Sequence, residues 1–147
     1  MKRSDASIAR QVREYRKRYP DKAILCDYDG MDGWAALAAG ASVPPIRGQV
    51  DAGLLAALPK MQPYEPASTP LASDQWALAE PGQNYVVYSL GEPVIRLELP
   101  SADAEFAVNW IDPSSGSMTG GDAVRGGEVR TFTPAGRGRR VLRVTRK

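Results

Sequence analysis

Between residues 75 and 145 the chain alternates apolar and polar residues in short runs that glycine and proline separate. Strict alternation puts the apolar side chains on one face of an extended strand. The predicted strands cover residues 75–79, 84–90, 94–99, 106–110, 129–133 and 140–145. Six or seven short strands at this spacing predict a small antiparallel β-sandwich. The run 84–90 is apolar on both faces, so we expect it to be a central strand.

The front of the chain has helical spacing instead. We predict a helix from a Ser4 or Asp5 cap to about Tyr19, where Pro20 ends it. Residues 23–26 form a short apolar run that suits a buried parallel strand. Two further helices are expected, and they cover 32–41 and 52–60, the second capped by Asp51.

These patterns predict an α+β chain in two parts. Residues 1–62 are expected to form a short α/β segment, and the proline-rich residues 63–74 are expected to form a linker. Residues 75–147 are expected to form the antiparallel sandwich of six to eight strands.

A turn at residues 110–116 is well specified by its residue types. Phe106, Val108 and Trp110 share one strand face, which predicts a core position for the tryptophan. Asp112 can accept bonds from backbone amides further along the turn, and Pro113 fixes its first central φ. Gly116 can supply a positive φ, so the sequence predicts a chain reversal here.

Composition excludes several kinds of chemistry. The 147-residue chain has no histidine and a single cysteine, Cys26. Intramolecular disulfides, Ser–His or Cys–His catalysis and histidine-ligated zinc are therefore excluded, and we expect no cofactor and no metal. The net charge of +2 implies no bulk attraction to polyanions.

Two basic stretches need an explanation. The first helix carries several arginines and lysines, which we expect to be a solvated face; nucleic acid or lipid contact is the alternative. The last strand, 140–145, is expected to be a charged edge strand that discourages aggregation, with an acidic polysaccharide ligand as the alternative. We expect no nucleic-acid or membrane partner.

The N-terminus shows no signal peptide, and no apolar run is long enough to span a membrane. We therefore expect a cytoplasmic protein as the sequence stands, or a secreted one if the chain is the tail of a longer precursor.

Asp27 and Asp29 follow the predicted strand 23–26 at the place where α/β folds bind ligands. Two such carboxylates could hold Mg²⁺, and the arrangement superficially resembles the aspartate motif of haloacid-dehalogenase-type phosphatases. No second α/β unit follows, so capping of the next helix is the favoured interpretation.

The second half carries an ordered set of motifs. They are Glu80-Pro81-Gly82, Tyr85, Tyr88, Trp110, Asp112-Pro113, Gly116, Gly126-Gly127, Val129, Phe132, Pro134 and Val141-Leu142. This half resembles the C-terminal β-sandwich, labelled as a collagen-binding domain, of glycoside hydrolase-like (apiosidase-like) bacterial proteins. Relative to the family pattern, Thr131 is an extra residue, which predicts a β-bulge.

The resemblance implies that the sandwich follows a (β/α)₈ barrel. Residues 1–62 look like the last β/α unit of that barrel, while the other units, which need on the order of 200 residues, are absent here. We therefore expect a non-catalytic accessory or structural module that packs on a catalytic barrel, or self-associates, through residues 1–62.

Carbohydrate or matrix binding is a further expectation, with Trp76, Tyr88 and Tyr64 as candidate residues for stacking on a polysaccharide. The alternative function is a hydrolase, either a glycosidase fragment that needs a partner or a Mg²⁺-dependent phosphatase using Asp27 and Asp29.

Overall fold

The computed structural model describes residues 4–26, 33–44, 46, 50–66 and 68–147, and it shows the predicted α+β fold. The helices are α1 (Asp5–Arg18), α2 (Gly33–Ala39), α3 (Ala52–Ala57) and the short 3₁₀ helix η1 (Leu58–Lys60). The strands are β1 (Gln62–Pro63), β2 (Gln75–Glu80), β3 (Asn84–Ser89), β4 (Ile95–Leu99), β5 (Glu105–Ile111), β6 (Met118–Gly120), β7 (Val124–Arg125), β8 (Glu128–Phe132) and β9 (Arg140–Arg146).

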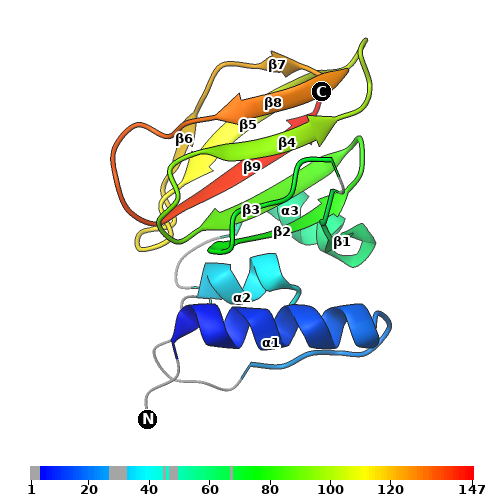
Figure 1. Ribbon diagram of the computed structural model, residues 1–147, viewed down its shortest axis with the longest axis vertical. Coiled ribbons are helices and arrows are strands. Elements are labelled where there is room, and N and C mark those ends of the chain that lie inside the picture. Colours follow the sequence, from blue (N-terminus) through cyan, green and yellow to red (C-terminus); the bar gives the residue numbers. More distant parts are fainter. Residues whose placement is uncertain (1–3, 27–32, 45, 47–49, 67) are drawn as a thin grey trace.

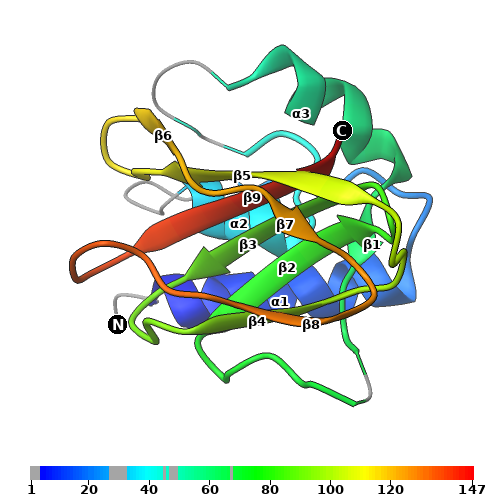
Figure 2. The ribbon, with the colours of Figure 1, turned by 90° about the horizontal axis from the view of Figure 1, so that it is seen from above.

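A seven-stranded sheet is the centre of the fold. Its strand order is β1-β2-β3-β9-β5-β6, with β7 also pairing with β5, and every pair is antiparallel. Figure 2 shows the twist of its strands from β5 through β9 and β3 to β2. Strands β4 and β8 pair with each other and form a separate two-stranded sheet. β3 has a neighbour on each side, which confirms the prediction of a central strand.

The expected charged edge strand at 140–145 is wrong, because β9 lies between β3 and β5. Leu142 and Val144 are buried on one face of β9, and Val141 and Arg143 are buried on the other. Because β9 is paired on both sides, it has no free backbone edge and needs no charged side chains to prevent sheet-to-sheet pairing. Its exposed charges are confined to the end of the strand and to the loop before it.

Two hydrophobic clusters lie on opposite faces of the main sheet. One lies between the main sheet and the β4–β8 pair, and it includes Tyr85, Val87, Leu97 and Phe106. Trp110 is only half-buried at the margin of this cluster, although it lies on the predicted face. Because side chains alternate along a strand, the odd-numbered residues of β3 point into this cluster, and the even-numbered residues point into the cluster on the opposite face of the sheet.

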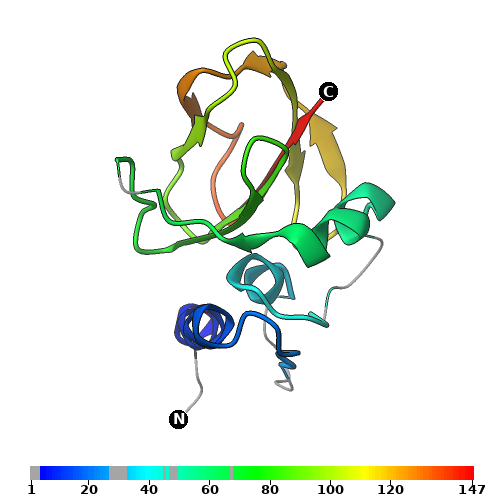
Figure 3. The same cartoon turned by 90° about the vertical axis from the view of Figure 1, so that its right-hand side faces the viewer.

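The second cluster joins the sheet to the helices. Trp76, Leu78, Val86 and Tyr88 contribute from β2 and β3, and all seven residues of α2 are buried against them. α2 lies between α1 and the sheet, as the side view shows (Figure 3). The helical layer and the sheet thus share one core (Figure 1). The division into parts at 62 and 74 stays a prediction.

The helix caps follow the sequence. The Ser4 hydroxyl accepts a bond from Ser7 N at 3.2 Å, and the Asp51 carboxylate accepts one from Leu54 N at 3.0 Å. Each cap side chain satisfies one of the free backbone amides of the first turn, and α1 and α3 begin where predicted.

The β-bulge expected at Thr131 is wrong. Ile95 pairs with Phe132 and Leu99 pairs with Glu128, with one residue opposite one throughout. The extra residue therefore changes which residues of β8 face the core, and Val129 faces solvent with 42 % of its surface exposed. Strands β6 and β7 were not predicted, because their segment is too short and glycine-rich for an alternation to be visible.

Candidate functional site

The helical layer carries an unusual sheet fragment. Leu25 and Val43 form an isolated parallel β-bridge, and their side chains are 71 % and 68 % exposed. The neighbouring Ile24 and Cys26 are half-buried against the core. Burial raises the pKa of the Cys26 thiol, which keeps it protonated and weakly nucleophilic. The predicted strand 23–26 is thus reduced to one bridge, which has no further parallel neighbour within the described residues.

The side chain of Arg16 holds this fragment in place. Its Nε donates to Gly40 O at 2.9 Å, its Nη1 donates to Pro20 O and Lys22 O, and its Nη2 donates to the Ser42 hydroxyl. Ser42 Oγ in turn accepts a bond from Ile24 N at 2.9 Å. A single guanidinium therefore ties the end of α1 to the loops on both sides of α2.

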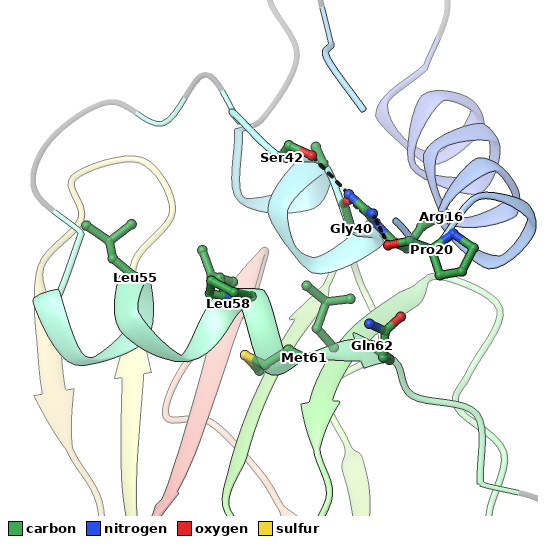
Figure 4. A pocket seen from close by; sticks show the side chains of 11 residues that line it. Arg16, Pro20, Gly40, Ser42, Leu55, Leu58, Met61 and Gln62 are labelled. Atoms are coloured by element: carbon green, nitrogen blue, oxygen red, sulfur yellow. Dashed lines mark hydrogen bonds between the residues drawn. The ribbon is translucent and has the colours of Figure 1, made fainter. Parts of the chain in front are cut away.

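A cavity of about 360 Å³ lies beside this clamp, between the helical layer and the start of the sheet. Figure 4 shows Arg16, Pro20 and Ser42 along one wall and Leu55, Leu58 and Met61 along the other. The Arg16 donors are already used by backbone carbonyls and Ser42. The guanidinium is therefore a structural group, and the remaining wall of the cavity is largely apolar.

The sequence candidates for sugar stacking are placed very differently. Trp76 and Tyr88 are 1 % and 0 % exposed, and their ring centroids lie 6.2 Å apart within the core shared with α2. Their rings pack against protein on all sides and present no face to a ligand in this structure. Tyr64 is half-buried and lines a cleft on the surface.

This cleft, here called the Tyr64 cleft, has a volume of about 380 Å³. Arg10 and Arg13 of α1 line it together with residues 64–66 and 70–73. Tyr64 is held firmly, because its N donates to Ala77 O at 2.9 Å and its hydroxyl accepts from Glu98 N at 3.0 Å. Tyr64 therefore connects β2 of the main sheet, through its backbone N, with β4 of the small sheet, through its hydroxyl.

Tyr64 and Tyr85 form an aromatic pair beneath the cleft. Their rings meet edge to face, with centroids 5.6 Å apart. Desolvation raises the pKa of both phenols above the ordinary value, and the nearby Glu98 carboxylate adds to the effect. The hydroxyl of Tyr85 accepts a hydrogen bond from Gly82 N at 2.8 Å. This bond gives the Gly82 and Tyr85 motif positions a structural role in the turn before β3.

The Trp110 to Gly116 turn is architectural. Asp112 Oδ1 accepts from Ser114 N at 2.8 Å and from Ser115 N at 3.2 Å, and Gly116 has a φ of 75°. These are the contacts that the residue types predict for the turn, and they confirm it.

Sequence reasoning missed an ion pair between a buried arginine and an exposed aspartate. Arg143 of β9 is only 8 % exposed at its side chain, and its Nη1 lies 2.8 Å from Asp51 Oδ2. Desolvation lowers the pKa of Arg143, and the Asp51 carboxylate opposes that effect. The signal was a lone arginine between the apolar residues Leu142 and Val144, which marks a charge that must find a partner.

Asp27 and Asp29 lie outside the described residues. Within the part of the chain that the structure describes, no group of three or more Cys, Asp or Glu side chains could hold a metal ion. The helices described here are also too short or too polar to cross a membrane.

One family model matches the front of the chain. A family model described as "Domain of unknown function (DUF6298)" matches residues 1–61, which is less than half of the chain. No curated protein matches this chain.

Two solved structures have a similar fold. A protein described as a glycoside hydrolase superposes with a TM-score of 0.52 and 13 % identity, over 99 % of this chain and 37 % of its own. A family 5 glycoside hydrolase from Bacteroides vulgatus superposes with a TM-score of 0.51 and 14 % identity, over 93 % of this chain and 36 % of its own.

At these identities the likeness concerns the fold alone. The helical layer and the β-sheets together match an arrangement found within solved glycoside hydrolases, and this chain spans just over a third of their length.

Proposed function

We propose that this chain is a non-catalytic accessory module of a glycoside hydrolase-like protein. Its helical layer packs against further β/α units, and its β-sandwich is carried on the other side of α2. The observation that carries the proposal is the exposed parallel bridge between Leu25 and Val43.

Parallel strands normally occur in sheets whose faces are both covered. Here a parallel pair presents two large apolar residues to water, next to the half-buried Ile24 and Cys26 of the core. Further β/α units would extend the parallel pairing and would cover both side chains. The much longer glycoside hydrolases with a similar fold support this arrangement.

The energy of such packing is appreciable. Full burial of a leucine or valine side chain is worth about 1.5–3 kcal/mol, and roughly 70 % of each side chain is available here, so each contributes about 1–2 kcal/mol. Two copies meeting through this edge would bury four such side chains. The alternative function, a hydrolase that uses Asp27 or Asp29, rests on residues that lie outside the described part of the chain.

Sedimentation velocity over a concentration series tests the proposal. The 147-residue chain should self-associate through the free edge, and Leu25→Glu with Val43→Glu should weaken that association at least a hundredfold. Val129→Glu is the matched control, because Val129 is also an exposed apolar residue but lies on β8. A monomer at several hundred micromolar, or equal loss in the control, would contradict the packing role.

A further inference from the structure

The Tyr64 cleft combines two kinds of wall. α1 supplies the cationic side chains of Arg10 and Arg13, and the segment after β1 supplies the apolar Tyr64, Pro66, Pro70 and Leu71 together with the polar Glu65 and Ser73. The second wall is rigid at Tyr64, whose ring is fixed by Tyr85 and whose hydroxyl is fixed by Glu98 N. A ligand here therefore meets positive charge on one side and an aromatic and proline surface on the other.

The charge on the α1 side is only partly compensated. Arg10, Arg13 and Lys17 lie at helical positions i, i+3 and i+7, so they share one face of α1. Glu65 is the carboxylate opposite them, with Oε2 3.1 Å from Lys17 Nζ and Oε1 3.7 Å from Arg13 Nε. The other nearby carboxylate, Glu14, lies 4.0 Å from Arg13 Nε. The face keeps an excess of positive charge.

Arg13 is paired in charge but lacks a hydrogen-bond acceptor at its Nε. Its Nε is shielded from water, and it has no hydrogen-bond partner among the described residues, since both carboxylates lie beyond hydrogen-bond range. A buried charged donor without an acceptor is costly. The planar fork of a guanidinium is best satisfied by a carboxylate, which offers two oxygens at once.

We propose that the Tyr64 cleft binds a carboxylate-bearing sugar residue of an acidic polysaccharide. The carboxylate faces Arg10 and Arg13, and the apolar face of the sugar ring lies against Tyr64 and the prolines. A neutral sugar offers the guanidinium of Arg13 only uncharged hydroxyl oxygens, which accept weaker hydrogen bonds than a carboxylate does. A simple anion such as phosphate makes no use of the apolar wall. The proposal uses other residues than the Leu25–Val43 edge and does not depend on the packing role.

The test is a titration of the ¹⁵N-labelled 147-residue chain, followed by amide chemical shifts. The probes are glucuronate, glucose and inorganic phosphate, each at matched ionic strength. We expect glucuronate to shift the amides of residues 10–13 and 64–73 and to bind at least tenfold more tightly than glucose or phosphate. Arg13→Gln should weaken glucuronate binding about tenfold or more, because a hydrogen bond to a charged group is lost.

Two further variants keep the result interpretable. Arg10→Gln changes an exposed side chain on the same wall and should also weaken binding without affecting the fold. Arg18→Gln is the control on the same helix, since its guanidinium lies 5.7 Å from the Tyr19 ring, outside the cleft residues. It should leave binding unchanged.

Several results would overturn the proposal. They are the absence of shifts at the cleft, equal affinity for glucose, equal affinity for phosphate, and equal weakening by the Arg18 and Arg13 variants. The first three need no variant, so misfolding of a variant cannot obscure them.

Discussion

Removal of the Asp51 carboxylate should destabilise the fold for two separable reasons. Asp51 Oδ2 lies 2.8 Å from Arg143 Nη1, and it also accepts the bond from Leu54 N that begins α3. Breaking a fully buried ion pair costs about 3–5 kcal/mol, because the remaining charge stays buried. The Asp51 side chain is 43 % exposed, so water screens the pair and we expect about 1–2 kcal/mol for its loss.

The capping bond adds about 1 kcal/mol. Asp51→Ala should therefore lower the free energy of unfolding by about 2–3 kcal/mol, whereas Asp51→Asn keeps a capping oxygen and should cost about 1–2 kcal/mol. Urea denaturation followed by tryptophan fluorescence measures both values. Asp122→Ala, in an exposed loop, is the control and should change stability by less than about 0.5 kcal/mol.

A double-mutant cycle isolates the ion pair. Arg143→Met removes the buried charge, so Asp51→Asn should cost much less in that background than in the wild-type chain. If Asp51→Asn is as stable as wild type, or costs the same in both backgrounds, the buried pair does not contribute as described here.

Two other predictions concern the sandwich. A Cβ added at Gly126 would overlap with the backbone oxygen of Ser101, so Gly126→Ala should destabilise the fold by about 1–3 kcal/mol in thermal melts. In the control Gly120→Ala, the nearest atom to the added Cβ is 3.9 Å away, and the stability should change by less than about 1 kcal/mol. Equal effects of the two substitutions would refute the close approach at Gly126. Because the folded-state pKa values of Tyr64 and Tyr85 are raised above 10.0, the stability that these two phenols contribute is present below pH 10 and is lost as pH rises through the folded values. Difference titrations at 295 nm with the two Tyr→Phe variants should show both phenols ionising above pH 10, and ionisation at or below that pH would count against their burial.

The sequence predicts the helices and strands well, and it predicts less well which elements lie beside each of them. Alternation in residues 84–90 gives both the strand and the two faces that the structure shows, because a period of two is a property of the strand itself. The position of β9 in the sheet is not local information. Its arginines suggest an edge, whereas the burial of Arg143 depends on Asp51, which lies 92 positions earlier in the chain.

The site shows the same limit. Aromatic residue type marks Trp76, Tyr88 and Tyr64 equally, but only Tyr64 lies at a cleft, because its segment crosses from the helical layer to the sheets. The cleft itself requires α1 to lie beside residues 64–66 and 70–73, and no pattern within either segment predicts that pairing. The exposed bridge between Leu25 and Val43 is likewise visible only once the fold is known.

Hydrogen exchange at Leu25 and Val43 tests the accessory-module account most directly. Amides that become buried at a strand edge exchange more slowly, so their protection should rise with chain concentration while that of the β4–β8 pair stays constant. Protection at both positions that does not change with concentration would contradict the account. A rise that is confined to the exposed Tyr15 of α1 and to Tyr19, which caps the C-terminus of α1, would also contradict it.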